Sequence, residues 1–65
     1  MAKTVFDVLQ DKLLEHRKSH VDFLAGGGAA DFAVYQAQCG LIRGLDIALR
    51  EVTDLAQHVL DNDDD

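Results

Sequence analysis

Three residues carry side chains that can bind a metal ion or act as a nucleophile: His16, His20 and Cys39. His16 and His20 stand four residues apart, which places two imidazoles on one face of a helix where they can share a metal ion. If the chain folds into a hairpin, Cys39 lies near His16 and adds a thiolate. The alternative is that the histidines are polar interruptions in a packing seam and Cys39 is a small buried hydrophobe. We expect the packing role, with no bound metal and no cofactor.

Catalysis by these groups would need a pocket that holds a nucleophile, a base and a substrate together. Two packed helices have no concave pocket of their own. The glycine run at residues 26–28 also lacks the preceding strand and the following Lys and Ser or Thr of a phosphate-binding loop. The sequence therefore predicts a protein that is not an enzyme.

Two helices must position these residues. From Thr4 to Ala25 there is no Gly or Pro, and apolar residues recur at steps of three and four, which indicates an amphipathic helix. Thr4 is a suitable N-cap, because its hydroxyl can accept a hydrogen bond from the amide of Asp7. The glycine run ends this helix, since each glycine costs up to about 1 kcal/mol in a helix relative to Ala.

A second periodic segment follows the glycines, with Asp31 as its cap or first-turn acid, and continues without Pro to Leu60. Because the connection is short, the two helices must be antiparallel neighbours. The predicted fold is all-α, an antiparallel hairpin over residues 4–25 and 30–60. Residues 1–60 form the one expected domain, and an acidic tail occupies residues 61–65.

The apolar sector of the second helix is wider than one partner helix can cover. Its main row is Val34, Gln38, Leu41, Leu45, Ala48, Val52, Leu55 and Val59, and a second row repeats every seven residues at Tyr35, Ile42, Leu49 and Ala56. We expect the second row and the overhang beyond about Val52 to pack against other protein. The predicted interface is Ala37, Gly40, Ile42, Gly44, Leu49, Val52, Leu55 and Val59.

Gly40 and Gly44 form a G-x-x-x-G pattern within this helix, at helical spacing from Ala33, Ala37 and Ala48. Such a strip of small residues lets another backbone approach closely. The contact would lie within the hairpin or across to a partner. The alternative is that the two glycines are merely tolerated, at about 1 kcal/mol each.

Charge and composition limit the classes of partner. The 65-residue chain has a net charge of −6, 48% hydrophobic residues and a single Cys. Direct nucleic-acid binding and anionic membranes are not expected, because both need clustered Lys and Arg. No signal peptide or transmembrane stretch is evident, so we expect a protein that is not secreted through a signal peptide. The expected partner is protein, in a homo-oligomer or a larger assembly.

Two charged features accompany the helices. Asp46, Arg50 and Asp54 step by four along the second helix with Arg43 before them, which predicts a solvent-exposed ladder of ion pairs. The tail carries four acids: Asp61, Asp63, Asp64 and Asp65. Without these four negative charges, the rest of the chain has a net charge of −2. We expect the tail to aid solubility or, alternatively, to dock on a basic surface.

The run Cys39-Gly40-Leu41-Ile42-Arg43-Gly44-Leu45-Asp46, with Ala48-Leu49-Arg50-Glu51-Val52 after it and the glycine turn before it, resembles small uncharacterised proteins of tailed bacteriophages. The similarity spans most of the chain and brings no catalytic residues. It implies a virion structural or assembly component near the head or connector, located in the virion or the host cytoplasm. The alternatives are a small acidic inhibitor that binds a host protein by mimicking nucleic-acid charge, and a metal-binding module.

Overall fold

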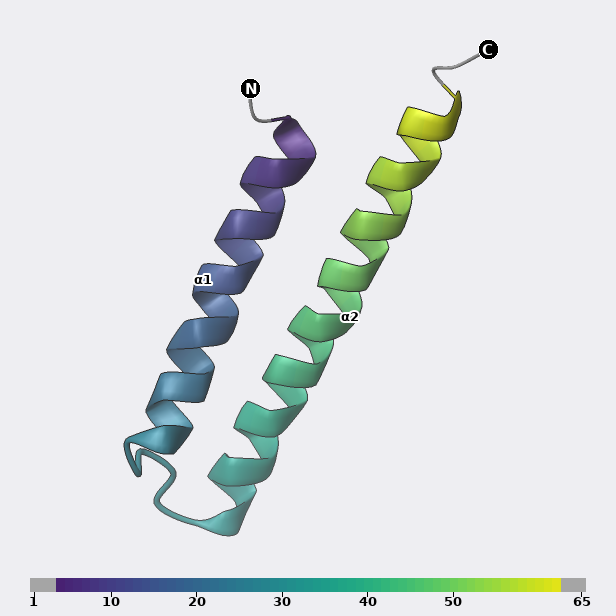
Figure 1. Cartoon of the computed structure of the whole chain (residues 1–65). Coiled ribbons are helices and arrows are strands. Elements are labelled where there is room, and N and C mark those ends of the chain that lie inside the picture. Colours follow the sequence, from purple (N-terminus) through teal and green to yellow (C-terminus); the bar gives the residue numbers. More distant parts are fainter. Residues whose placement is uncertain (1–3, 63–65) are drawn as a thin grey trace.

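The computed structural model describes residues 4–62, with side chains described for residues 4–59, and these residues form two helices, α1 (Val5–Ala25) and α2 (Phe32–Asn62). The helices lie side by side and run in opposite directions (Figure 1). The Cα atoms span 53 × 21 × 11 Å, so the molecule is a slab two helices wide and one helix thick. The predicted all-α hairpin is confirmed.

The start of α1 is fixed by a reciprocal pair of hydrogen bonds. The Asp7 backbone amide donates to Thr4 Oγ1 at 3.1 Å, and the Thr4 amide donates to Asp7 Oδ2 at 3.1 Å. This capping box satisfies two amides that have no partner within the helix. The predicted N-cap is confirmed, and Asp7 also places a negative charge at the positive end of the helix dipole.

The glycine run forms the C-terminal cap of α1. The Gly28 amide donates to the Phe23 carbonyl at 2.8 Å and the Gly27 amide to the Leu24 carbonyl at 3.1 Å. These two bonds, with Gly27 at φ 79°, define a Schellman motif. A Cβ at Gly28 would come within 2.5 Å of the Phe23 ring, so a larger residue there would require this ring to move.

The second helix begins two residues later than predicted. Asp31 Oδ1 accepts a hydrogen bond from the Val34 amide at 2.9 Å, which is the geometry of an N-cap. Ala29 and Ala30 therefore belong to the connection, which runs over residues 26–31. At its other end α2 continues to Asn62, past the predicted end at Leu60.

The longer connection changes which residues face each other. Arg17 meets Asp46 and Gln10 meets Thr53, so each level of α1 lies opposite a later part of α2 than a symmetric turn would give. The expected proximity of His16 to Cys39 is therefore wrong. The overhang also begins later than Val52, because Thr53 still bonds to α1 and Ala56 is half-buried. Figure 1 shows the last turns of α2 extending beyond the start of α1.

Candidate interaction surface

A heptad seam joins the helices. The half-buried residues recur at steps of four and three on both of them, as in antiparallel coiled coils. On α1 the seam is Phe6, Gln10, Leu13, Arg17, His20 and Leu24, and on α2 it is Val34, Gln38, Ile42, Leu45, Leu49, Val52 and Ala56. The half-buried Val21, Cys39 and Ala48 border this seam. None of the side chains described between residues 4 and 59 is fully buried. The hairpin alone has a seam but no core.

The seam draws on both of the apolar rows that periodicity predicts for α2. Ile42 and Leu49 were expected to face another protein, but they are half-buried in the seam, together with Val52. Leu41 and Leu55, from the main row, are exposed instead. The expectation that the second row points away from the hairpin is therefore wrong for Ile42 and Leu49, whereas Tyr35 of the same row is exposed.

One flank of the seam is polar. Arg17 Nε contacts Asp46 Oδ1 at 2.6 Å, and Gln10 Nε2 donates to Thr53 Oγ1 at 2.7 Å. The hydrogen bond and charge of Asp46 raise the pKa of the Arg17 guanidinium. Because Asp46 pairs with α1, it does not belong to the outward ladder predicted with Arg50. This ion pair is open to solvent and orients the helices more than it stabilises them.

The opposite flank is apolar. A residue in an α-helix is turned by about 100° from the one before it, so residues on the other side of the seam from the polar contacts share one surface. We call this surface the apolar face, and its exposed apolar or small members are Val5, Leu9, Phe23, Ala37, Leu41, Gly44, Leu55 and Val59. The exposed His16 lies on the same row of α1, between Leu9 and Phe23, because these three residues are spaced by seven. The apolar face holds six of the eleven large hydrophobic side chains exposed in the described part of the chain. Of the other five, Phe32 and Tyr35 stack on each other on α2, and Val8, Leu14 and Ile47 lie elsewhere.

The two mid-helix glycines do not serve the hairpin. A Cβ built at Gly40 or Gly44 would meet nothing within 4 Å, so neither glycine faces α1. The interpretation that they allow close packing within the hairpin is therefore wrong. Gly44 lies on the apolar face, while Gly40 lies further round the outer side of α2. Two interpretations of these glycines remain. They allow close contact with a partner protein, or the helix tolerates them without a packing role.

The candidate metal ligands are not brought together. His20 lies in the seam, where its Nδ1 is 2.7 Å from Gln38 Oε1, and His16 is exposed on the apolar face. Cys39 is a half-buried free thiol on α2. Among the residues that the structure describes, no three His, Cys, Asp or Glu side chains lie close enough together to hold a metal ion. The arrangement makes His20 a polar member of a packing seam.

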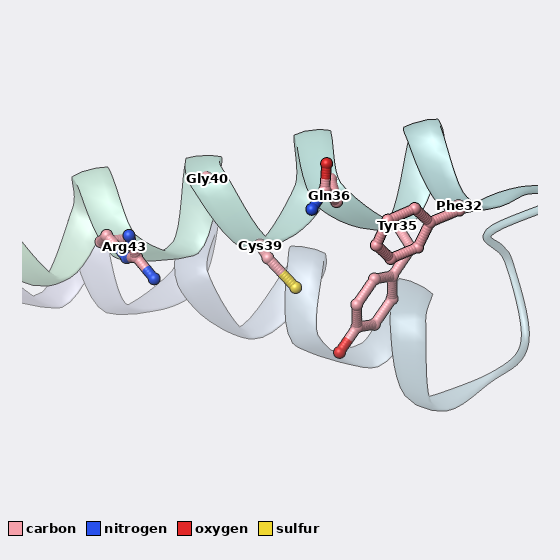
Figure 2. A pocket seen from close by; sticks show the side chains of 6 residues that line it. All are labelled: Phe32, Tyr35, Gln36, Cys39, Gly40 and Arg43. Carbon is pink, nitrogen blue, oxygen red and sulfur yellow. The ribbon is translucent and has the colours of Figure 1, made fainter.

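A shallow hollow of about 310 Å³ lies on the outer side of α2 (Figure 2). It is lined by Phe32, Tyr35, Gln36, Cys39, Gly40 and Arg43, all from this one helix. The Phe32 and Tyr35 rings stack with centroids 6.2 Å apart. None of the six lining residues is a His, Asp or Glu that could take the thiol proton from Cys39. Sequence reasoning did not single out this hollow, although the three-residue spacing of the two aromatic residues was its one visible sign.

Tyr35 and Cys39 interact at the rim of the hollow. The hydrogen bond with Cys39 and the negative charge of its thiolate raise the pKa of the Tyr35 phenol. The pairing stabilises the local side-chain arrangement on α2.

The predicted acidic tail lies outside the described side chains: Asp61, Asp63, Asp64 and Asp65. No helix in the described part of the chain is both long enough and apolar enough to cross a membrane. Comparison of the chain with models of known families, with curated proteins and with solved structures finds no match.

Proposed function

We propose that this chain is a non-enzymatic helix-packing subunit, whose helices are completed by other protein. The observation that supports the proposal is the absence of any fully buried side chain between residues 4 and 59. The hairpin nevertheless exposes large apolar side chains from both helices on the apolar face. Exposed apolar surface of this extent is typical of protein–protein contact sites.

The lone hairpin lacks the main stabilising contribution to folding, which is the burial of apolar surface. Isolated helices are marginal in water, and most helical stability in proteins comes from burying an amphipathic face. Fully burying a Leu or Phe side chain contributes about 1.5–3 kcal/mol, and here Leu9, Phe23, Leu41 and Leu55 all remain exposed. Contact with protein over the apolar face would supply that missing contribution.

In its most concrete form the proposal is a structural or assembly component of a phage virion. That form rests on the resemblance of residues 35–55 to small phage proteins. The helix-packing role does not depend on it, because that role follows from the exposed apolar face alone.

The test is the helix content of the purified chain, followed by circular dichroism as the chain is diluted. A hundredfold change of concentration alters the stability of an associating chain by up to about 2.7 kcal/mol. We expect helix content and thermal midpoint to fall on dilution, or the chain to stay unfolded until another protein is added. A monomer that keeps its full helix content at every concentration would contradict the proposal.

A further inference from the structure

We infer that the apolar face is the surface on which a second copy of this chain packs, so that two hairpins form a four-helix bundle. This inference rests on the proposed function, and it identifies a second copy of the chain as the protein that completes the hairpin. Each hairpin is a slab one helix thick, and stacking two slabs face to face creates the two-layer arrangement around a shared core that small domains need.

The accessible area of the chain matches what one such contact would remove. The chain exposes 5124 Å². A compact monomer of 7.1 kDa exposes about 4,100 Å², so the excess is about 1,000 Å². A stable interface of standard size buries about 800 Å² on each partner. The open surface of the hairpin is therefore large enough for one contact of standard size.

The shape of the apolar face suits its own copy. If the two-fold axis runs parallel to the helices, α1 of one copy stacks on α2 of the other, and all neighbouring helices are antiparallel. The contacts of His20 with Gln38 and of Arg17 with Asp46 then place Phe23 level with residues 35–40 of the other copy, a stretch that includes Ala37. The large side chain meets a small one, and the exposed Gly44 allows the backbones to approach closely.

The charges around the apolar face also favour its own copy. Lys12 lies at the margin of the face on α1 and Glu51 at its margin on α2, both exposed. In the stacked arrangement Lys12 of one copy lies level with Glu51 of the other, because Arg17 meets Asp46 and Gln10 meets Thr53 within each hairpin. A lipid surface is a poorer occupant, since the chain has a net charge of −6 and only six Lys and Arg residues.

The experiment is sedimentation equilibrium and native mass spectrometry of the full chain, with variants matched in exposure. Leu41→Glu changes a side chain on the apolar face that is 50% exposed, and Leu14→Glu changes one on the opposite flank that is also 50% exposed. Leu55→Glu, at 53%, is matched by Ile47→Glu, at 54%, which lies on the outer side of α2.

We expect a dimer whose dissociation constant rises by at least about tenfold in each apolar-face variant, because a leucine that dimerisation buries is lost. The two control variants should leave the dissociation constant within about threefold of the original, as expected for surface substitutions. If Leu14→Glu or Ile47→Glu dissociates the dimer as strongly as the apolar-face variant with which it is matched, the contact lies elsewhere and the inference fails.

A charge swap between two exposed residues tests the same contact with substitutions that leave the folding of the hairpin intact. Lys12→Glu should weaken the dimer, and adding Glu51→Lys in the same chain should restore it, because the pair forms between copies. Failure of the double variant to recover would overturn the arrangement proposed. A chain that is unfolded alone but folds on another protein would sink the second-copy inference and leave the proposed function standing. A fully helical monomer would contradict both.

Discussion

The same substitution should have opposite effects at two glycines of this chain. Gly27 and Gly40 each have nothing within 4 Å of an added Cβ, so Ala fits both positions and only the backbone differs. Gly27 sits at φ 79°, where an L-residue costs about 1–2 kcal/mol. Gly40 lies in the interior of α2, where Ala is favoured by about 1 kcal/mol. Gly27→Ala should therefore destabilise the protein and Gly40→Ala should stabilise it.

The two variants should differ by about 2 kcal/mol in the free energy of unfolding, which for a chain of this size separates their thermal midpoints by about 10 °C. The assay is thermal and urea unfolding followed by circular dichroism, at one fixed chain concentration because association also shifts the midpoint. The reasoning would be refuted if Gly27→Ala matched or exceeded the original protein in stability, since the left-handed turn would then not need glycine.

Three further predictions concern the caps and the polar contacts. Thr4→Ala removes the capping box and should lower the free energy of unfolding by about 0.5–2 kcal/mol in urea titrations; no change would mean that α1 starts elsewhere. The Tyr35 phenol should titrate above its ordinary pKa in ultraviolet absorbance, and Cys39→Ala should bring the pKa back down; any stability from this pair is present below the unfolded-state pKa and is lost as pH rises through the raised one. Coupling between Arg17 and Asp46, measured with a double-mutant cycle, should be small and should fade in high salt, whereas salt-resistant coupling would contradict an exposed ion pair.

The ends of the helices were largely predictable because they depend on local chemistry. Thr4 and Asp7 sit three residues apart, which is the spacing of a capping box, and three successive glycines have few roles other than a turn. The start of α2 was missed by two residues, since Ala29 and Ala30 are good helix formers and only the Asp31 cap keeps them out of the helix. Helix propensity favours an earlier start of α2, whereas the N-cap at Asp31 sets the start that is observed.

The face of α2 that packs on α1 was not predictable from periodicity. Both of its apolar rows have steps compatible with a helix seam, so the pattern does not distinguish the row with Ile42 from the row with Leu41. The choice depends on the register between helices, which is set by the six-residue connection and by contacts such as Arg17 with Asp46. The same register explains why Cys39 and His16 do not meet.

The central claim is that this hairpin is incomplete as a single chain and is completed by its own copy. Sedimentation equilibrium under reducing conditions, at micromolar chain concentration, tests it most directly. We predict a species with twice the chain mass of 7.1 kDa that dissociates in Leu41→Glu but not in Leu14→Glu. A monomer of 7.1 kDa that retains the helix content of both α1 and α2 would contradict the claim.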